Sequence, residues 1–83
     1  MEQKQIEQFF NNDKLLATSI KLFQQENTVS ASLLQRKLCI GFPRAMQIIE
    51  ALEQLEVISK PEDGDYKRQL LEIDEKIKKY IEQ

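Results

Sequence analysis

The sequence predicts a mainly helical domain with a small β-hairpin, which is an α+β fold of the winged helix-turn-helix type. Apolar residues recur at helical spacing in successive segments, and two short strand-like segments flank a polar turn after the third core helix. The 83 residues suffice for one small core. We expect a three-helix core, a wing and an extra terminal helix.

We divide the chain into an N-terminal extension, a winged helix-turn-helix domain and a C-terminal amphipathic helix, at residues 1–12, 13–72 and 73–83. Ile6, Phe9 and Phe10 have the spacing of one helical face, so the extension can form a short helix. Asn11-Asn12-Asp13 then interrupts this helix and offers an N-cap to the next one.

The first two core helices follow from apolar spacing and capping residues. The first is expected from Lys14 to about Glu26, with an apolar face formed by Leu16, Ile20 and Phe23. Asn27-Thr28-Val29 is an extended link, and Ser30 is the expected N-cap of the second helix. Gly41 marks the end of that helix.

The third helix, from about Pro43 to Leu55, has the clearest pattern in the chain. Pro43 fits its first turn, where the missing N–H group costs nothing. Its apolar stripe consists of Ala45, Ile48, Ile49, Leu52 and Leu55. The opposite side is polar, so one face packs in the core and the other is free to contact a ligand.

The wing is predicted from two short segments around a turn. Val57-Ile58-Ser59 forms the first strand, residues 60–65 form the turn, and residues 66–71 form the second strand. The last helix has Ile73, Ile77, Tyr80 and Ile81 on one face. That face packs either back on the domain or across a dimer interface.

The composition excludes several classes of catalytic and metal-binding site. The chain has no His, one Cys and two Gly, which excludes Ser-His-Asp triads, His-containing zinc sites and P-loops. We therefore expect no catalytic residues, metal ligands or cofactor, and no enzyme. Cys39 follows Leu38 and precedes Ile40, so it is expected to be a small buried apolar residue. The lone Cys and the lack of a signal peptide or membrane-spanning segment predict a cytoplasmic protein with no membrane partner.

The third helix has the side chains of a DNA-recognition helix. In a major groove, Arg44 suits guanine, Gln47 suits adenine and Glu50 suits cytosine. The expected phosphate contacts come from basic residues around the turn and the wing, which are Arg36, Lys37, Lys60, Lys67 and Arg68. The net charge of -2 means that the placement of these cations matters more than their sum. Three acidic residues at the tip of the wing would repel phosphates. We therefore expect the flanks of the wing, and not Asp63-Gly64-Asp65, to contact DNA.

The run from Val29 to Leu38, followed by Ile40-Gly41-Phe42, Arg44-Ala45, Ile48-Ile49 and Leu52-Glu53, resembles the gamma domain of the FtsK and SpoIIIE DNA translocases. The resemblance spans about residues 13–72. It implies a winged-helix fold that binds short, oriented sequences in duplex DNA and loads a motor in the correct direction. The residues then expected to contact bases are Pro43, Arg44, Gln47 and Glu50, and Gln35, next to Arg36 in the LLQR motif, joins the phosphate-contacting set.

Three positions depart from the family pattern. Pro43 replaces a polar residue, often Asn, and Gln47 replaces a second Arg, so the family's target sequence is not carried over. Glu56 stands where the family places a helix-ending Gly. Because a positive φ costs a non-glycine residue about 1 kcal/mol, we expect the third helix to end differently here.

Our leading interpretation is a sequence-specific double-stranded DNA-binding protein of bacterial, plasmid or phage origin, acting in DNA segregation, transfer or local transcription regulation. It binds as a homodimer or as tandem monomers, with a motor or relaxase as a further partner. The chain has no Walker motif, and its added terminal segments favour a stand-alone protein over an excised domain. The alternative is a winged-helix module for protein–protein interaction or dimerisation.

Overall fold

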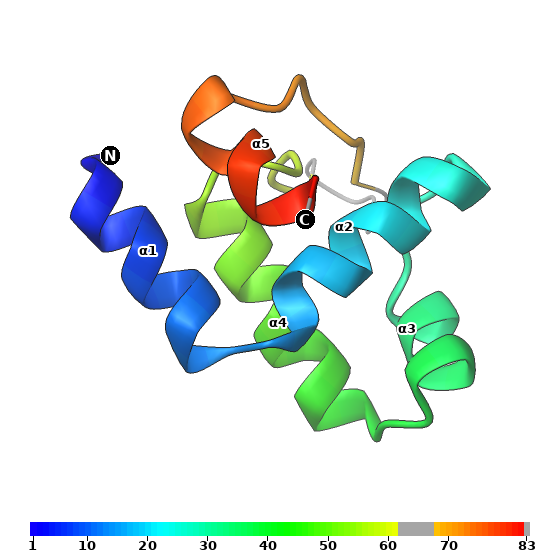
Figure 1. The fold of residues 1–83 in the computed structure, drawn as a ribbon. Helices are drawn as coiled ribbons and strands as arrows, with labels where there is room; N and C mark the ends of the chain where they lie inside the picture. Colours follow the sequence, from blue (N-terminus) through cyan, green and yellow to red (C-terminus); the bar gives the residue numbers. More distant parts are fainter. Residues whose placement is uncertain (62–67, 83) are drawn as a thin grey trace.

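The structure is a computed structural model that describes residues 1–61 and 68–82. This part of the chain is mainly helical, as predicted (Figure 1). Its five helices are α1 (Gln3–Asn12), α2 (Leu15–Glu26), α3 (Ala31–Leu38), α4 (Phe42–Gln54) and α5 (Glu75–Ile81). None of these helices is long and apolar enough to cross a bilayer.

Short polar side chains accept backbone hydrogen bonds at the start of three helices. The Leu15 N–H donates to Asp13 Oδ1 at 3.0 Å, although the N-cap residue of α2 is Lys14 and Asp13 precedes it. Ser30 Oγ accepts from the Leu33 N–H at 3.3 Å, which confirms Ser30 as the N-cap of α3. Asp74 Oδ1 accepts from the Lys76 N–H at 2.8 Å at the start of α5. Each of these side chains satisfies a backbone donor that the helix itself leaves free.

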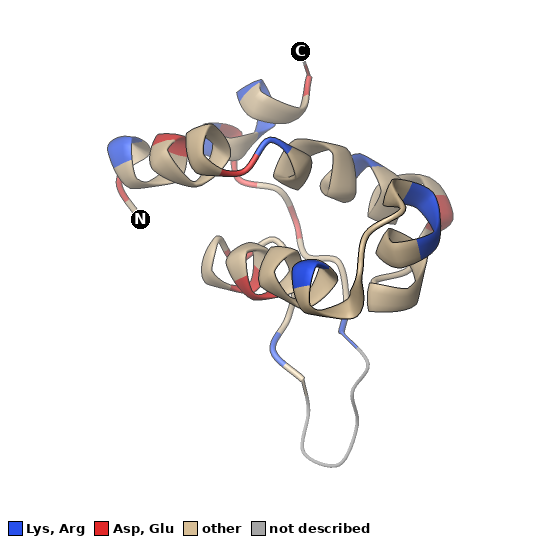
Figure 2. Ribbon diagram, turned by 90° about the horizontal axis from the view of Figure 1, so that it is seen from below, with Lys and Arg blue, Asp and Glu red and all other residues tan. Residues whose placement is uncertain are grey.

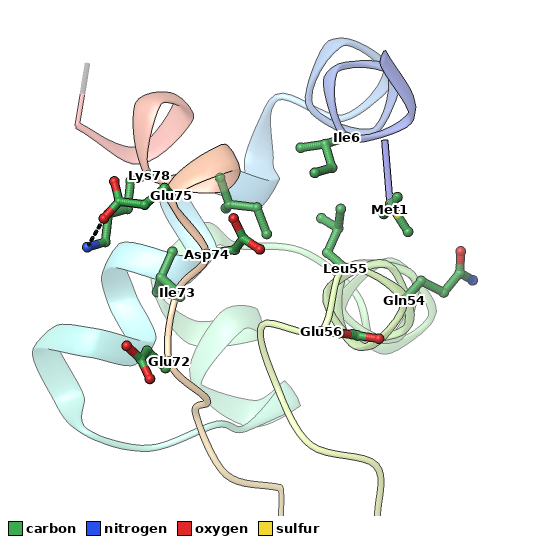
Figure 3. A pocket seen from close by; sticks show the side chains of 11 residues that line it. Met1, Ile6, Gln54, Leu55, Glu56, Glu72, Ile73, Asp74, Glu75 and Lys78 are labelled. Atoms are coloured by element: carbon green, nitrogen blue, oxygen red, sulfur yellow. Dashed lines mark hydrogen bonds and ion pairs between the residues drawn. The ribbon is translucent and has the colours of Figure 1, made fainter. Parts of the chain in front are cut away.

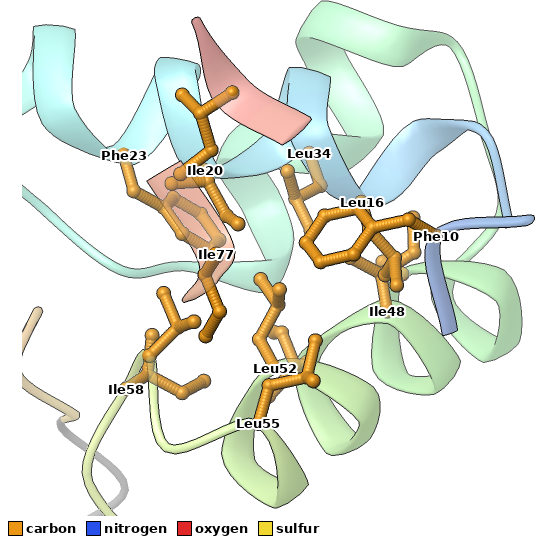
Figure 4. Close-up of a cluster of buried hydrophobic side chains, with 14 of the residues drawn as sticks. Phe10, Leu16, Ile20, Phe23, Leu34, Ile48, Leu52, Leu55, Ile58 and Ile77 are labelled. Atoms are coloured by element: carbon orange, nitrogen blue, oxygen red, sulfur yellow. The ribbon is translucent and has the colours of Figure 1, made fainter. Parts of the chain in front are cut away.

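The core lies where α2 and α3 pack against α4 (Figure 4). Leu16, Ile20 and Phe23 of α2 are fully buried, as their spacing predicted. The apolar stripe of α4 is buried as well, with Leu55 the most exposed of its members at 5%. Each large side chain removed from water in this way stabilises the fold by about 1.5–3 kcal/mol.

The two terminal helices pack on the same core and on each other. Ile77 and Ile81 of α5 are 2% and 7% exposed, and the Tyr80 ring stacks on Phe10 of α1 with centroids 4.5 Å apart. The α5 face that could have formed a dimer interface is therefore covered within one chain, while Ile73 is half-buried beside it.

Polar contacts also join the two ends of the chain. Gln3 Nε2 donates to the Lys76 carbonyl at 3.2 Å and to the Tyr80 hydroxyl at 3.3 Å. Lys76 Nζ donates to the Met1 carbonyl at 3.4 Å. As a result, the segments that begin and end the chain lie side by side.

The two segments of the expected wing pair with each other only at isolated residues. The Ser59 N–H donates to the Gln69 carbonyl at 2.9 Å and the Leu71 N–H donates to the Val57 carbonyl at 2.8 Å, on either side of the antiparallel pair Ile58–Leu70. A second isolated bridge joins Val29 to Arg68. No regular strand occurs in residues 1–61 and 68–82, so the hairpin prediction is not met there.

A local cause limits this pairing. The Gln69 N–H donates to the Ser59 side chain at 2.8 Å, so it is not used in a continuous ladder. The predicted tip of the wing, residues 62–67, lies outside the described residues.

The end of α4 differs from our expectation. Glu56 adopts the left-handed conformation with φ 60° although it is not a glycine. The Val57 N–H donates to the Leu52 carbonyl and the Glu56 N–H to the Glu53 carbonyl, both at 3.0 Å. These two bonds form a Schellman motif, and Val57 packs with Leu52 in the core as that motif favours. The helix therefore ends in the way a glycine would end it, because the two hydrogen bonds and the buried contact offset the strain at Glu56.

Cys39 was expected in the core but is exposed. It ends α3 with φ 54°, again in the left-handed region, and Leu38 and Ile40 on either side are half-buried. The reversal of the chain at Cys39 turns its side chain outward, which a run of three apolar residues does not reveal.

Candidate nucleic-acid interface

One side of α4 is exposed next to the α3–α4 turn. Pro43, Gln47 and Glu50 lie on this side, at successive turns of the helix, and all three are exposed. Ala45 and Ile48 on the opposite side are fully buried. The period of the apolar stripe thus holds α4 against the core and leaves one polar face outward.

Arg44, predicted to contact a base, is held in an ion pair. Its Nη1 donates to Asp13 Oδ2 at 2.8 Å and its Nη2 donates to Asp13 Oδ1 at 2.6 Å. The Arg44 side chain is 37% exposed and that of Asp13 is 17% exposed. The hydrogen bond from Arg44 lowers the pKa of Asp13, against an opposing effect of burial, and the same bond raises the pKa of Arg44.

The role of Asp13 as a partner of Arg44 was missed at the level of sequence. Asp13 was expected only as an N-cap of the next helix; its side chain does accept from the Leu15 N–H, but the N-cap residue of α2 is Lys14. The ion pair joins positions 31 residues apart, and no helical or strand period links them. Only the packing of the α1–α2 turn beside the start of α4 brings the two charges together.

Arg68, predicted to contact a phosphate, is also engaged internally. Its Nη1 pairs with Glu53 of α4 and donates to the Ser59 carbonyl at 3.4 Å. The side chains of Arg68 and Glu53 are 14% and 26% exposed. This pair fixes the segment after residue 67 to the side of α4.

The other cations predicted to contact phosphates are more accessible. Arg36 and Lys37 on α3 and Lys60 after α4 are exposed, while Gln35 is half-buried. Lys37 Nζ lies 3.9 Å from Glu26, in a pair whose side chains are both about half exposed. Lys67 lies outside the described residues. Figure 2 shows Lys and Arg on α3, near the start of α4 and on both segments that lead to residues 62–67.

Acidic side chains gather at the other end of α4. A hollow there has Met1, Leu55 and Ile73 on its walls (Figure 3). Its rim carries the carboxylates of Glu56, Glu72, Asp74 and Glu75, and Lys78 pairs with Glu75 at 3.2 Å. Within residues 1–61 and 68–82, no three such groups are placed to hold a metal ion. This rim would repel a phosphate backbone, which leaves the start of α4 as the end suited to a polyanion.

The fold and its charges define a small helical domain with a helix-turn-helix pair and one exposed helix face beside accessible cations. The chain belongs to the FtsK gamma domain family, which matches residues 11–72. The resemblance to this family is therefore confirmed.

The relatives are much longer proteins named DNA translocase FtsK. That of Caldanaerobacter subterraneus subsp. tengcongensis is 43% identical over 70 residues, which are 84% of this chain and 10% of the relative. The Clostridium tetani protein is 43% identical over 61 residues, covering 74% and 8%. That of Chlamydia pneumoniae is 41% identical over 59 residues, covering 71% and 7%. The chain spans a tenth or less of the length of these relatives. No solved structure gives a significant match.

One prediction is corrected by these relatives. We expected no enzyme, but the relatives are named as translocases. The composition argument failed because it tested this short chain for catalytic residues, and the chain matches only the gamma domain of much longer proteins.

Proposed function

We propose that this gamma domain binds double-stranded DNA with α4 in the major groove. The observation that carries the proposal is the exposed row Pro43, Gln47 and Glu50, which projects from a helix whose opposite face is buried. Its position after a tight turn is that of a recognition helix in helix-turn-helix proteins. The names of the relatives support a DNA ligand.

The proposed contacts divide into two groups. Gln47 contacts adenine and Glu50 accepts a hydrogen bond from cytosine, and these contacts give sequence preference. Arg36, Lys37 and Lys60 neutralise phosphates on either side of α4, with Lys67 added from the wing. Arg44 and Arg68 reach DNA only by leaving or sharing their partners Asp13 and Glu53.

We further propose that the domain selects the DNA sites used in segregation by translocases of this family, and that it has the winged-helix architecture. The isolated pairs Ile58–Leu70 and Val29–Arg68 support that architecture, because they bring together three segments that a wing would unite. Selection of bound duplexes from a random pool identifies the preferred site.

The salt dependence of affinity tests the phosphate contacts. For the selected duplex, log Kd is plotted against log salt concentration. The slope of this plot is expected to decrease by about 0.9 for each phosphate contact removed. The variants Arg36→Ala and Lys37→Ala should each show this loss, whereas Lys4→Ala on α1 should leave the slope unchanged. Binding that is absent, or that does not respond to salt, contradicts DNA binding and favours a protein-interaction module.

A further inference from the structure

The first residue of α4 has an exposed aromatic side chain. Phe42, the first residue of the helix, is 49% exposed, and the other large apolar side chains exposed in residues 1–61 and 68–82 are Met1 and Leu71. Pro43 follows it and is exposed too. The start of the proposed recognition helix therefore presents two adjacent apolar side chains to solvent, one turn before Gln47.

The charges beside this apolar surface are compensated within the molecule. Helix α4 has three charged residues, which are Arg44, Glu50 and Glu53. Arg44 is paired with Asp13 on one side of the exposed face, and Glu53 is paired with Arg68 on the other. Among the described ion pairs none involves Glu50, so the face contains two apolar residues, a neutral amide and one carboxylate.

This chemistry fits one feature of the major groove. Thymine alone among the four bases presents an apolar group there, the C5 methyl, and side chains such as Phe make apolar contact with it. The first residues of a recognition helix are those that approach base edges. A guanine, by contrast, calls for a free guanidinium, and Arg44 has both terminal nitrogens engaged by Asp13.

We propose that Phe42 and Pro43 contact thymine C5 methyl groups next to the base pairs that Gln47 and Glu50 contact. This assignment rests on the proposed DNA binding and adds a specificity determinant to it. The domain would thus distinguish thymine from uracil and cytosine at one or two positions of its site.

Single replacement of thymine by uracil tests the proposal, because uracil keeps the base-pairing groups and lacks only the methyl. Each thymine of the selected duplex is replaced in turn, and Kd is measured by fluorescence anisotropy. Replacement at one or two positions should weaken binding. The expected loss is about fourfold for each methyl removed, because the burial of one CH2-sized apolar group contributes about that factor to affinity. The variant Phe42→Ala should lose the uracil effect at one position or more, and Phe42→Ala combined with Pro43→Ala should bind the thymine and uracil duplexes equally.

Two further variants control for general effects. Phe42→Leu keeps an apolar side chain and should retain the preference for thymine. Leu71→Ala removes another exposed apolar side chain, 39% exposed and outside α4, and should also retain it. Circular dichroism establishes that each variant is folded.

The failures are distinguishable. Intact binding with no uracil effect at any position overturns the thymine assignment and leaves DNA binding standing. A uracil effect that persists in full when Phe42→Ala and Pro43→Ala are combined also overturns it, since other residues then make the contacts. Absence of binding to every duplex overturns both proposals.

Discussion

Arg44 at the start of α4 donates from both terminal nitrogens to the two carboxylate oxygens of Asp13, which also accepts from the Leu15 N–H at the start of α2. One carboxylate thus serves a helix start and an ion pair that ties this start to α4. The two roles can be separated, because an amide keeps the oxygen that accepts from Leu15 and loses the charge.

The first prediction concerns pH. The pKa of Asp13 in the folded protein lies below its ordinary value of 3.8. The stabilisation from this charge is therefore present above that value and is lost as the pH falls through the lowered pKa. Because Arg44 is partly exposed and screened by water, we expect Asp13→Asn to cost about 0.5–1 kcal/mol at neutral pH. Urea unfolding should show this difference in full from about pH 5 to 7 and its decrease as the pH falls below 3.8. A difference that stays constant over that range contradicts the ion pair as its source.

The second prediction concerns the hydrogen bond from Leu15 to Asp13. Asp13→Ala removes the acceptor for the Leu15 N–H as well as the charge, so it should cost about 1 kcal/mol more than Asp13→Asn. Unfolding of both variants in the same buffer measures the increment. Equal stabilities would show that the Leu15 hydrogen bond contributes nothing measurable.

The third prediction concerns the end of α4. Glu56→Gly should stabilise the protein by about 1 kcal/mol, because glycine adopts φ 60° without the steric cost of a β-carbon. Glu56→Ala is the matched control, since it removes the same carboxylate and keeps the strain. If both variants gain equally in urea unfolding, charge repulsion near the acidic rim, and not backbone strain, explains the gain.

The fourth prediction compares two serines. Ser19 is fully buried in α2 and its hydroxyl has no hydrogen-bond partner in the described structure. Ser19→Ala should stabilise the protein by about 1 kcal/mol, because it removes an unsatisfied polar group with little change in volume. Ser30→Ala removes the α3 cap and should destabilise by about 1 kcal/mol. Thermal unfolding measures the change in stability of both variants, which should have opposite signs. A destabilising Ser19→Ala would mean that the hydroxyl has an unrecognised partner.

The fifth prediction concerns α5. Ile77 is 2% exposed within the core, so Ile77→Ala should destabilise the fold by about 2–5 kcal/mol. Glu82→Ala, at an exposed position after the helix, should have little effect. Urea unfolding measures the loss, and light scattering measures the mass in solution. A change in oligomeric state without loss of stability would instead make Ile77 an interface residue.

The helices of this domain were predictable because their signals are local. The spacing of Leu16, Ile20 and Phe23 and the cap at Ser30 each depend on neighbours within one or two turns. The ion pairs of Arg44 and Arg68 were not predictable, since each joins charges that meet only after the helices pack. The same holds for the positive φ of Cys39 and Glu56. At Glu56, hydrogen bonds and core packing around the helix end offset the residue's own backbone preference.

The hydrogen bonds from Gln3 and Lys76 keep the two ends of the described chain together on the α1–α5 side of the molecule, and the start of α4 lies on the other side (Figure 1). A fluorophore, an affinity tag or a larger polypeptide joined at either end therefore leaves from that side. It can anchor the domain to a surface or to another protein while Phe42, Gln47 and Glu50 stay open to solvent.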